Sequence, residues 1–290
     1  MNNKSILNPG VMSCGFLLKQ MTVSCFLGIL LGLPGISALA ADNEATPGDA
    51  VPEPKKNLTV DLGNAVKLEM VLIQTGTFMM GAENVSENEK PVHKVTLTKP
   101  FYMGKYEVTQ EQWQAVMGDN PSQFKEGAEA GKRPVEQVSW DDVSAKFLPK
   151  LAERMPKGWT PRLPSEAEWE YCCRAGTTGD YSGELDKMTW YEGNSENKTH
   201  PAGGKKANAW GLYDMHGNVW EWCADLKGDY PSEAVTDPTG ASSGSYRIGR
   251  GGSWGGDAKY CRSAYRDWGT PGYRGLRLGF RLAMDIPPLK

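Results

Sequence analysis

The sequence predicts one compact α+β domain with little regular secondary structure. Short runs of alternating apolar residues, typical of strands, come before three helix starts that are marked by capping residues. The chain of 290 residues also holds 34 glycines and 19 prolines, spread along its length. This usage excludes coiled coils, helical bundles and helical solenoids.

Residues 1–40 have the pattern of a signal peptide. Two lysines are their only charges, the apolar run Val23–Leu33 follows, and the small residues Ala38–Ala40 form an A-x-A cleavage site. An uncleaved anchor helix is the alternative, but Pro34 and Gly35 interrupt the apolar run. We therefore expect cleavage, a secreted or periplasmic protein, and no membrane segment in the mature chain.

Residues 41–65 are rich in Pro, Glu, Asp and Asn and predict a flexible linker, because too few apolar side chains are present to offset the entropy of ordering. Residues 66–290 then form the domain. The formal charge is −3, and it becomes −5 when two lysines leave with the signal peptide. This balance excludes the basic footprint of a protein that binds nucleic acid.

Four segments near the start of the domain predict strands. They are Lys67–Ile73, Thr77–Met80, Val92–Leu97 and Tyr102–Val108.

Three helices are expected after these strands. Their capping boxes pair Thr109 with Gln112, Ser139 with Asp142, and Ser165 with Glu168. Pro149 should kink or end the second helix, and Gly176 follows the end of the third. Beyond Gly176 the sequence predicts almost no regular structure until Leu278–Ala283.

The densest group of polar and aromatic residues is the run Asn208–Asp225. Asp214 and Glu221 offer carboxylate oxygens, and Gly217 permits a sharp turn that can point backbone carbonyls inward. Such a loop suits calcium, which takes six to eight oxygen ligands in flexible geometry. From the spacing alone, two acids on a solvated loop are favoured over a calcium site.

Cysteines are the other reactive side chains. The mature chain keeps Cys172, Cys173, Cys223 and Cys261, an even number that permits disulfides in an oxidising compartment. No C-x-x-C pair is present, which excludes a zinc ribbon or a thioredoxin-type motif. Cys172 and Cys173 are adjacent on a predicted helix, where a bridge would be strained, so we expect both to be reduced.

Seen together, these motifs resemble the formylglycine-generating enzyme family, also called the sulfatase-modifying-factor domain. The segments that carry the resemblance are Phe78–Gly81, Glu89–His93, Tyr106–Thr109, Pro134–Trp140, Arg162–Tyr171, Gly211–Trp222, Arg250–Trp254 and Gly279–Arg281. The resemblance implies a compact α+β fold related to the C-type lectin fold. It also implies a candidate activity, the oxidation of a sulfatase cysteine to formylglycine with copper and molecular oxygen.

The resemblance also assigns binding roles to particular residues. A family calcium site corresponds to the side chains of Asp214 and Glu221 with the carbonyls of Gly217 and Val219. Ser253 and Trp220 match positions that line the active-site groove of the family. The segments that carry Cys223 and Cys261 are neighbours in the family fold, which suggests a Cys223–Cys261 disulfide.

The resemblance fails at the copper centre. Active family members hold copper with two cysteines spaced C-x-x-x-x-C, as paired thiolates suit Cu(I). Counted from Ser253, the first position is Gly256 and the second is Cys261; counted back from Gly279, Cys261 matches neither. Two hypotheses remain. The missing cysteine favours a relative that uses the scaffold for a divergent activity or to bind a sulfatase or another peptide or glycan ligand; the alternative is an active oxidase that uses Cys261 in an altered way.

Overall fold

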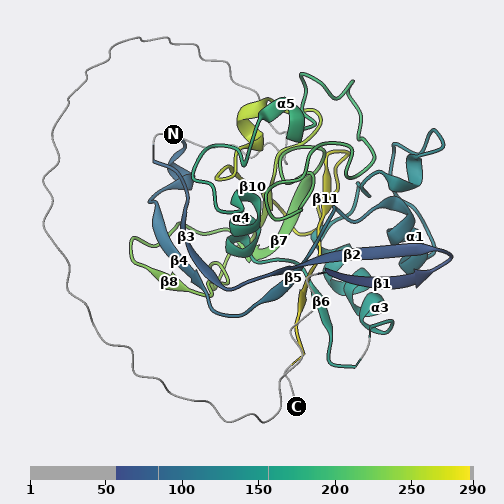
Figure 1. Cartoon of the computed structure of the whole chain (residues 1–290), viewed down its shortest axis with the longest axis horizontal. Coiled ribbons are helices and arrows are strands. Elements are labelled where there is room, and N and C mark those ends of the chain that lie inside the picture. The colour runs from purple at the N-terminus through teal and green to yellow at the C-terminus, as the bar shows by residue number, and fades with distance from the viewer. Residues whose placement is uncertain (1–56, 84, 156, 288–290) are drawn as a thin grey trace, which may run out of the picture. The chain divides into compact units, whose positions relative to one another are not determined.

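The computed structural model describes residues 57–83, 85–155 and 157–287 (Figure 1). The predicted signal peptide and residues 41–56 of the predicted linker lie outside this part. The described residues form a mixed α+β domain with sheets of five, four and three strands. The predicted fold class is therefore confirmed.

The five-stranded sheet contains the N-terminal hairpin of the domain. Its strands, in spatial order, are β1 (Asn57–Gly63), β2 (Val66–Ile73), β5 (Phe101–Gly104), β12 (Ala283–Asp285) and β6 (Thr160–Arg162). The linker prediction is wrong for residues 57–63, because β1 pairs with β2 in antiparallel register and Leu62 is buried. The ladder with β2 supplies the hydrogen bonds that composition alone did not suggest.

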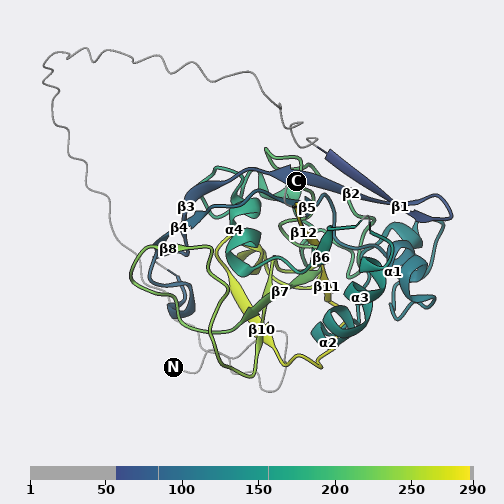
Figure 2. The ribbon, with the colours of Figure 1, turned by 90° about the horizontal axis from the view of Figure 1, so that it is seen from below.

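Each face of this sheet covers a separate apolar core. Leu68 and Met70 of β2 join the cluster that contains α1 (Gln110–Met117) and α3 (Leu148–Ala152) residues. Val71 and Ile73 point to the opposite face and join the cluster that contains residues of α4 (Glu166–Arg174). The alternation follows from the two-residue period of side chains along a strand. Figure 2 shows α1 and α3 near β1, and α4 near β3.

The helices begin where their capping residues predict. In all three capping boxes the hydroxyl of the N-cap residue accepts the N3 backbone N–H, and the N3 side chain accepts the N-cap N–H in return. The second helical stretch starts as α2 (Trp140–Asp142), passes through a π-helical segment (Val143–Phe147) and continues as α3. Pro149 lies in the first turn of α3, where its missing N–H is tolerated. A short α5 (Leu185–Met188) follows, and no described helix is long and apolar enough to cross a membrane.

The remaining strands form two smaller sheets. The four-stranded sheet has the order β10 (Arg266–Gly269), β9 (Arg247–Arg250), β7 (Trp220–Leu226) and β11 (Leu278–Phe280); the three-stranded sheet has β3 (Gly76–Met80), β4 (His93–Leu97) and β8 (Val235–Thr236). The prediction of almost no regular structure between Gly176 and Leu278 is therefore wrong, because α5, β7, β8, β9 and β10 lie there. Residues 220–223 of β7 are buried without interruption, so this strand lacks the alternating pattern of a half-buried one.

Candidate functional site

The loop from Asp214 to Glu221 leads directly into β7. Asp214, Gly217 and Asn218 adopt positive φ angles of 56°, 93° and 61°, so the backbone turns sharply before the strand starts. The side chains of Asp214 and Glu221 are 2% and 0% exposed. The alternative of two acids on a solvated loop is therefore wrong.

Glu221 is neutralised by a guanidinium from the C-terminal part of the chain. Arg281 Nη2 lies 2.7 Å from Glu221 Oε1, and Arg281 Nε lies 3.0 Å from Oε2. The indole of Trp169 donates a third hydrogen bond to Glu221 Oε2 at 2.7 Å. Both carboxylate oxygens thus have protein donors.

Glu107 is a third buried acid in this region, and we had not predicted a role for it. Its Oε1 accepts the backbone N–H of Val219 at 3.0 Å, and its Oε2 accepts Asn218 Nδ2 at 2.7 Å. Burial and the nearby charges of Asp214 and Glu221 raise the pKa of Glu107 well above its usual value. Glu107 belongs to the Tyr106–Thr109 motif, but no pattern in the neighbouring sequence indicates that it contacts a loop more than 100 residues away.

Asp214 completes what we call the acid-rich cluster: Glu107, Asp214, Glu221 and Arg281. Asp214 Oδ2 accepts the backbone N–H of Gly203 at 2.6 Å, whereas the buried Oδ1 has no hydrogen-bond partner among the described residues. Burial raises the pKa of Asp214 to about 6, and Glu221 adds to this effect. The cluster sets three carboxyl groups against one guanidinium.

A second buried cluster has the opposite balance. This arginine-rich cluster contains Glu166, Glu170, Arg174, Arg250 and Arg266. Arg266 holds Glu166 with two bonds of 2.6 and 2.7 Å, while Arg250 bonds to Glu170 and Arg174 Nη2 lies 2.7 Å from Glu170 Oε1. Burial alone would raise the pKa of Glu166, but Arg266 and Arg250 outweigh it and lower that pKa.

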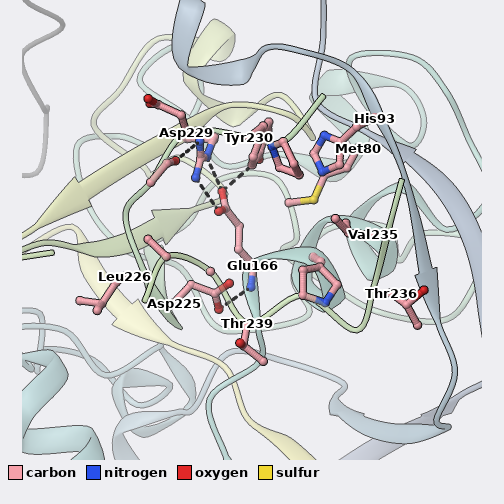
Figure 3. A pocket seen from close by; sticks show the side chains of 17 residues that line it. Met80, His93, Glu166, Asp225, Leu226, Asp229, Tyr230, Val235, Thr236 and Thr239 are labelled. Atoms are coloured by element: carbon pink, nitrogen blue, oxygen red, sulfur yellow. Dashed lines mark hydrogen bonds and ion pairs between the residues drawn. The ribbon is translucent and has the colours of Figure 1, made fainter. Parts of the chain in front are cut away.

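A hollow of about 480 Å³ opens beside the arginine-rich cluster (Figure 3). Segments that are far apart in the sequence line it. They are the last residue of β3, the first residue of β4, the start of α4, the stretch that follows β7, and Arg266 of β10. Figure 3 shows the carboxyl groups of Glu166 and Asp225 in the middle of the lining, with Tyr230, His93 and Met80 to one side. We did not predict this hollow from the sequence.

Cys261 lies in a tightly packed turn. The residue is 0% exposed, and burial raises the pKa of its thiol to about 12. A Cβ atom added at Gly252 would lie 2.5 Å from Cys261 Sγ, so the backbone of the Gly-Gly loop approaches the thiol directly. At Gly256 an added Cβ would lie 3.3 Å from the ring of Tyr260 and 3.9 Å from Ser253 Oγ.

A family model matches this chain over most of the described domain. The model of the sulfatase-modifying factor enzyme 1-like domain matches residues 61–286. The chain belongs to the formylglycine-generating enzyme family.

Its relatives in this family bear different names. "Chaperone protein LppX" of Paenibacillus barcinonensis is 34% identical, over 64% of this chain and 78% of the relative. "Formylglycine-generating enzyme" of Streptomyces coelicolor is 35% identical over 52% of each chain. "Serine/threonine-protein kinase pkn1" of Chlamydia caviae is 32% identical, over 75% of this chain, but the chain spans only 38% of its length.

A solved structure agrees with the family fold. "Treponema denticola variable protein 1" superposes with a TM-score of 0.73 at 35% identity, covering 78% of this chain and 98% of that one. This chain therefore has the fold of the formylglycine-generating enzyme family. A shared fold does not by itself fix the activity of each member.

The groove predicted from the family is closed at the predicted residues. Ser253 and Trp220 are only 1% and 2% exposed, so neither faces an open groove. Trp220 belongs to the apolar core, and Trp254, which is 7% exposed, packs against Phe124 with ring centroids 5.4 Å apart. Ser253 Oγ is buried without a hydrogen-bond partner among the described residues.

The predicted Cys223–Cys261 disulfide is wrong. All four cysteines in the described part of the chain are free and buried. Cys223 packs in the apolar core with Cys172 and Cys173, whereas Cys261 lies against the Gly252 backbone. The Cys261 carbonyl accepts the Nδ1–H of His216 at 2.7 Å, which helps to hold the turn in place.

The residues predicted to bind calcium fit a cation in part. The unpartnered Asp214 Oδ1 and the excess of carboxyl groups favour one, because a divalent cation would supply the missing positive charge. Glu221, however, already has Arg281 and Trp169 as partners. No group of three or more His, Cys, Asp or Glu side chains that could hold a metal occurs in the described residues, so the carbonyls of Gly217 and Val219 would have to complete the set.

Proposed function

We propose that this protein is a secreted member of the family that does not oxidise sulfatase cysteines and acts by binding a peptide or glycan partner. The observation that carries the proposal is the state of Cys261. A fully buried thiol with a pKa near 12 is protonated at neutral pH, and the thiolate is the form that binds metal. Gly256 offers no second sulfur.

The names of the relatives do not point to a single activity. A chaperone protein, a kinase and a formylglycine-generating enzyme are each similar to this chain over part of their length. A fold shared by such different proteins does not fix the chemistry, so the site residues must decide.

Export is part of the proposal. The n-region, apolar run and A-x-A site of residues 1–40 support cleavage after Ala40. Mass spectrometry of protein recovered from the periplasm or the medium should find Ala41 as the first residue. Intact protein that starts at Met1 and stays in the cytosol would contradict export.

We also propose calcium as a structural ion of the acid-rich cluster. Asp214 would be its carboxylate ligand through Oδ1, with Glu221 and the carbonyls of Gly217 and Val219 as the remaining ligands. The ion would balance the negative charge that one guanidinium leaves uncompensated.

The test of the main proposal is a peptide conversion assay. The mature protein is incubated with copper, oxygen and a Cys-x-Pro-x-Arg sulfatase peptide, and mass spectrometry follows the loss of mass when cysteine becomes formylglycine. We expect no conversion above the level of a Cys261→Ser control. Conversion by the unmodified protein that disappears in Cys261→Ser would restore the oxidase hypothesis.

A further inference from the structure

The hollow of Figure 3 combines apolar walls with two buried carboxyl groups, those of Glu166 and Asp225. Its apolar and aromatic side chains include Met80, Leu226, Tyr230 and Val235. The volume of about 480 Å³ lies within the range of small-ligand sites. A few placed polar groups in such a lining decide which ligand fits.

Asp225 supplies the polar group that lacks a full set of partners. The side chain is only 3% exposed, and its Oδ2 accepts the backbone N–H of Glu166 at 2.9 Å. Its Oδ1 accepts no hydrogen bond from any described residue, although the side chain lines the hollow. This oxygen is not sealed in the interior, so a ligand that enters the hollow can donate a hydrogen bond to it.

Gly240 keeps this carboxyl group uncovered. A Cβ atom added there would lie 2.7 Å from Asp225 Cβ and 3.0 Å from Asp225 Oδ1. Gly240 also has a φ of +80°, which disfavours any other residue. The loop that follows β8 therefore passes over Asp225 without closing off its oxygen.

No described Lys or Arg forms an ion pair with Asp225, although Arg247 and Arg266 lie near enough to act on it electrostatically. Arg266 is fully used, because it holds Glu166 with two bonds and donates to the carbonyls of Asn88 and Gly228. The hydroxyl of Tyr230 also donates to Glu166. The lining thus presents an acid with no ion pair to any described residue next to surfaces that suit an alkyl chain.

We infer that this hollow binds an alkylammonium group, with the ammonium on Asp225 and the alkyl chain along Met80 and Val235. The ammonium could belong to a lysine side chain of the partner or to a free organic amine, and the two share the same recognition chemistry. The lysine form rests on the proposed binding function, whereas the free-amine form does not. The oxidase assay has no bearing on either.

Titration of Asp225 gives the inference a second readout. Burial raises the pKa of Asp225 to about 7, and Glu166 adds to this effect. The charged or titratable groups near it are Glu166 and Glu168 of α4, Cys223 of β7, Arg247 of β9, Arg266 of β10, and His93, Asp229 and Tyr230 in the wall of the hollow. An ammonium ion binds the ionised form, so affinity should rise about tenfold between pH 6 and pH 8 while the amine stays protonated.

The experiment measures binding of n-butylammonium to the mature protein by NMR titration, with 1-butanol as the neutral control. We expect saturable binding of butylammonium at pH 8, weaker binding at pH 6, and much weaker binding of butanol. Asp225→Asn should lower the affinity at least tenfold, since asparagine can still accept the Glu166 N–H but carries no charge. Asp237→Asn, an exposed aspartate of the same loop outside this hollow, should leave it unchanged.

Two capped tripeptides separate the sources of the ammonium. A lysine of a peptide partner would be supported if Gly-Lys-Gly bound more tightly than butylammonium and Gly-norleucine-Gly did not bind. A small ligand would be supported if the free amine bound more tightly than Gly-Lys-Gly. Equal binding of butanol and butylammonium, no binding of either, or unchanged affinity in a folded Asp225→Asn variant would overturn the inference. Circular dichroism of the variant establishes folding, and the pH dependence of the unmodified protein tests the inference without any variant.

Discussion

The acid-rich and arginine-rich clusters bury similar groups but differ in their balance of charge. The first sets Glu107, Asp214 and Glu221 against Arg281 alone, and the pKa values of Glu107 and Asp214 are raised. In the second, three arginines surround two glutamates, and the pKa of Glu166 is lowered. Burial acts in the same direction on all these acids, so the number of nearby guanidinium groups decides the sign of the shift.

The difference in charge balance also gives the two clusters different structural roles. The glutamates of the arginine-rich cluster join α4 to β9 and β10, so that region is held together by complete ion pairs. The acid-rich cluster keeps an unpartnered oxygen on Asp214 and excess negative charge. Such a site is held together less well by its own side chains and is open to protons or to a cation.

The largest expected effect comes from the same substitution made in both clusters. Glu170→Gln removes a charge that partners two buried arginines, and we expect the free energy of unfolding at pH 7 to fall by about 3–5 kcal/mol. Glu107→Gln removes one of three crowded acids and should cost about 1 kcal/mol or less. Urea unfolding of both variants measures the difference.

The matched control is Glu129→Gln, which alters an exposed ion pair with Lys132 and should have no measurable effect. If Glu107→Gln proved as costly as Glu170→Gln, the charge balance of the clusters would not be what distinguishes them.

The next effect is a dependence of stability on pH with opposite signs in the two clusters. The pKa of Asp214 is raised from 3.8 to about 6, so the folded state holds its proton more tightly than the unfolded state. Stability should therefore fall as pH rises from 4 to 6 in calcium-free buffer, by up to about 3 kcal/mol at 1.36 kcal/mol per pKa unit. Unfolding curves of Asp214→Asn and of the unmodified protein, compared at each pH, isolate the contribution of Asp214 to the pH dependence of stability.

Glu166 should behave in the opposite way, because its pKa is lowered in the folded state. Its contribution to stability is present above about pH 4.5, near the unfolded pKa, and is lost as pH falls below it. If Asp214→Asn left the slope between pH 4 and pH 6 unchanged, the raised pKa of Asp214 would be wrong.

A smaller effect is expected from calcium. An ion that binds only the folded acid-rich cluster would stabilise the protein by about 2.7 kcal/mol at 100 times its dissociation constant. Calcium should raise the melting temperature of the unmodified protein, and Asp214→Asn should abolish that response. Melting curves that coincide with calcium and with a chelator would show that Arg281 alone balances the cluster.

Local signals predicted much of the fold. Each capping box uses residues three apart, and all three formed as expected around Thr109, Ser139 and Ser165. The errors fell where neighbours in space decide the structure. Residues 57–63 look like linker by composition but become a strand because β2 lies beside them, and β7 lacks alternation because both of its faces are buried.

The candidate site was predictable only in part for the same reason. The loop of Asp214 and Glu221 stands out because its residues are close together in the sequence. Glu107 accepts a hydrogen bond from Val219, which lies 112 residues further along the chain, and Arg281 donates to Glu221, from which it is separated by 60 residues. No pattern within one segment indicates these partners, nor the guanidinium groups that surround Glu166 and Glu170.

Our central proposal is that this protein keeps the family scaffold without a thiolate copper centre. The most direct measurement is a titration of the reduced mature protein with Cu(I), in competition with a chromophoric chelator, for the unmodified chain and for Cys261→Ser. We predict that the two proteins bind Cu(I) equally, because the buried, protonated Cys261 thiol takes no part. Tight binding of one Cu(I) per chain that is lost in Cys261→Ser would contradict the proposal.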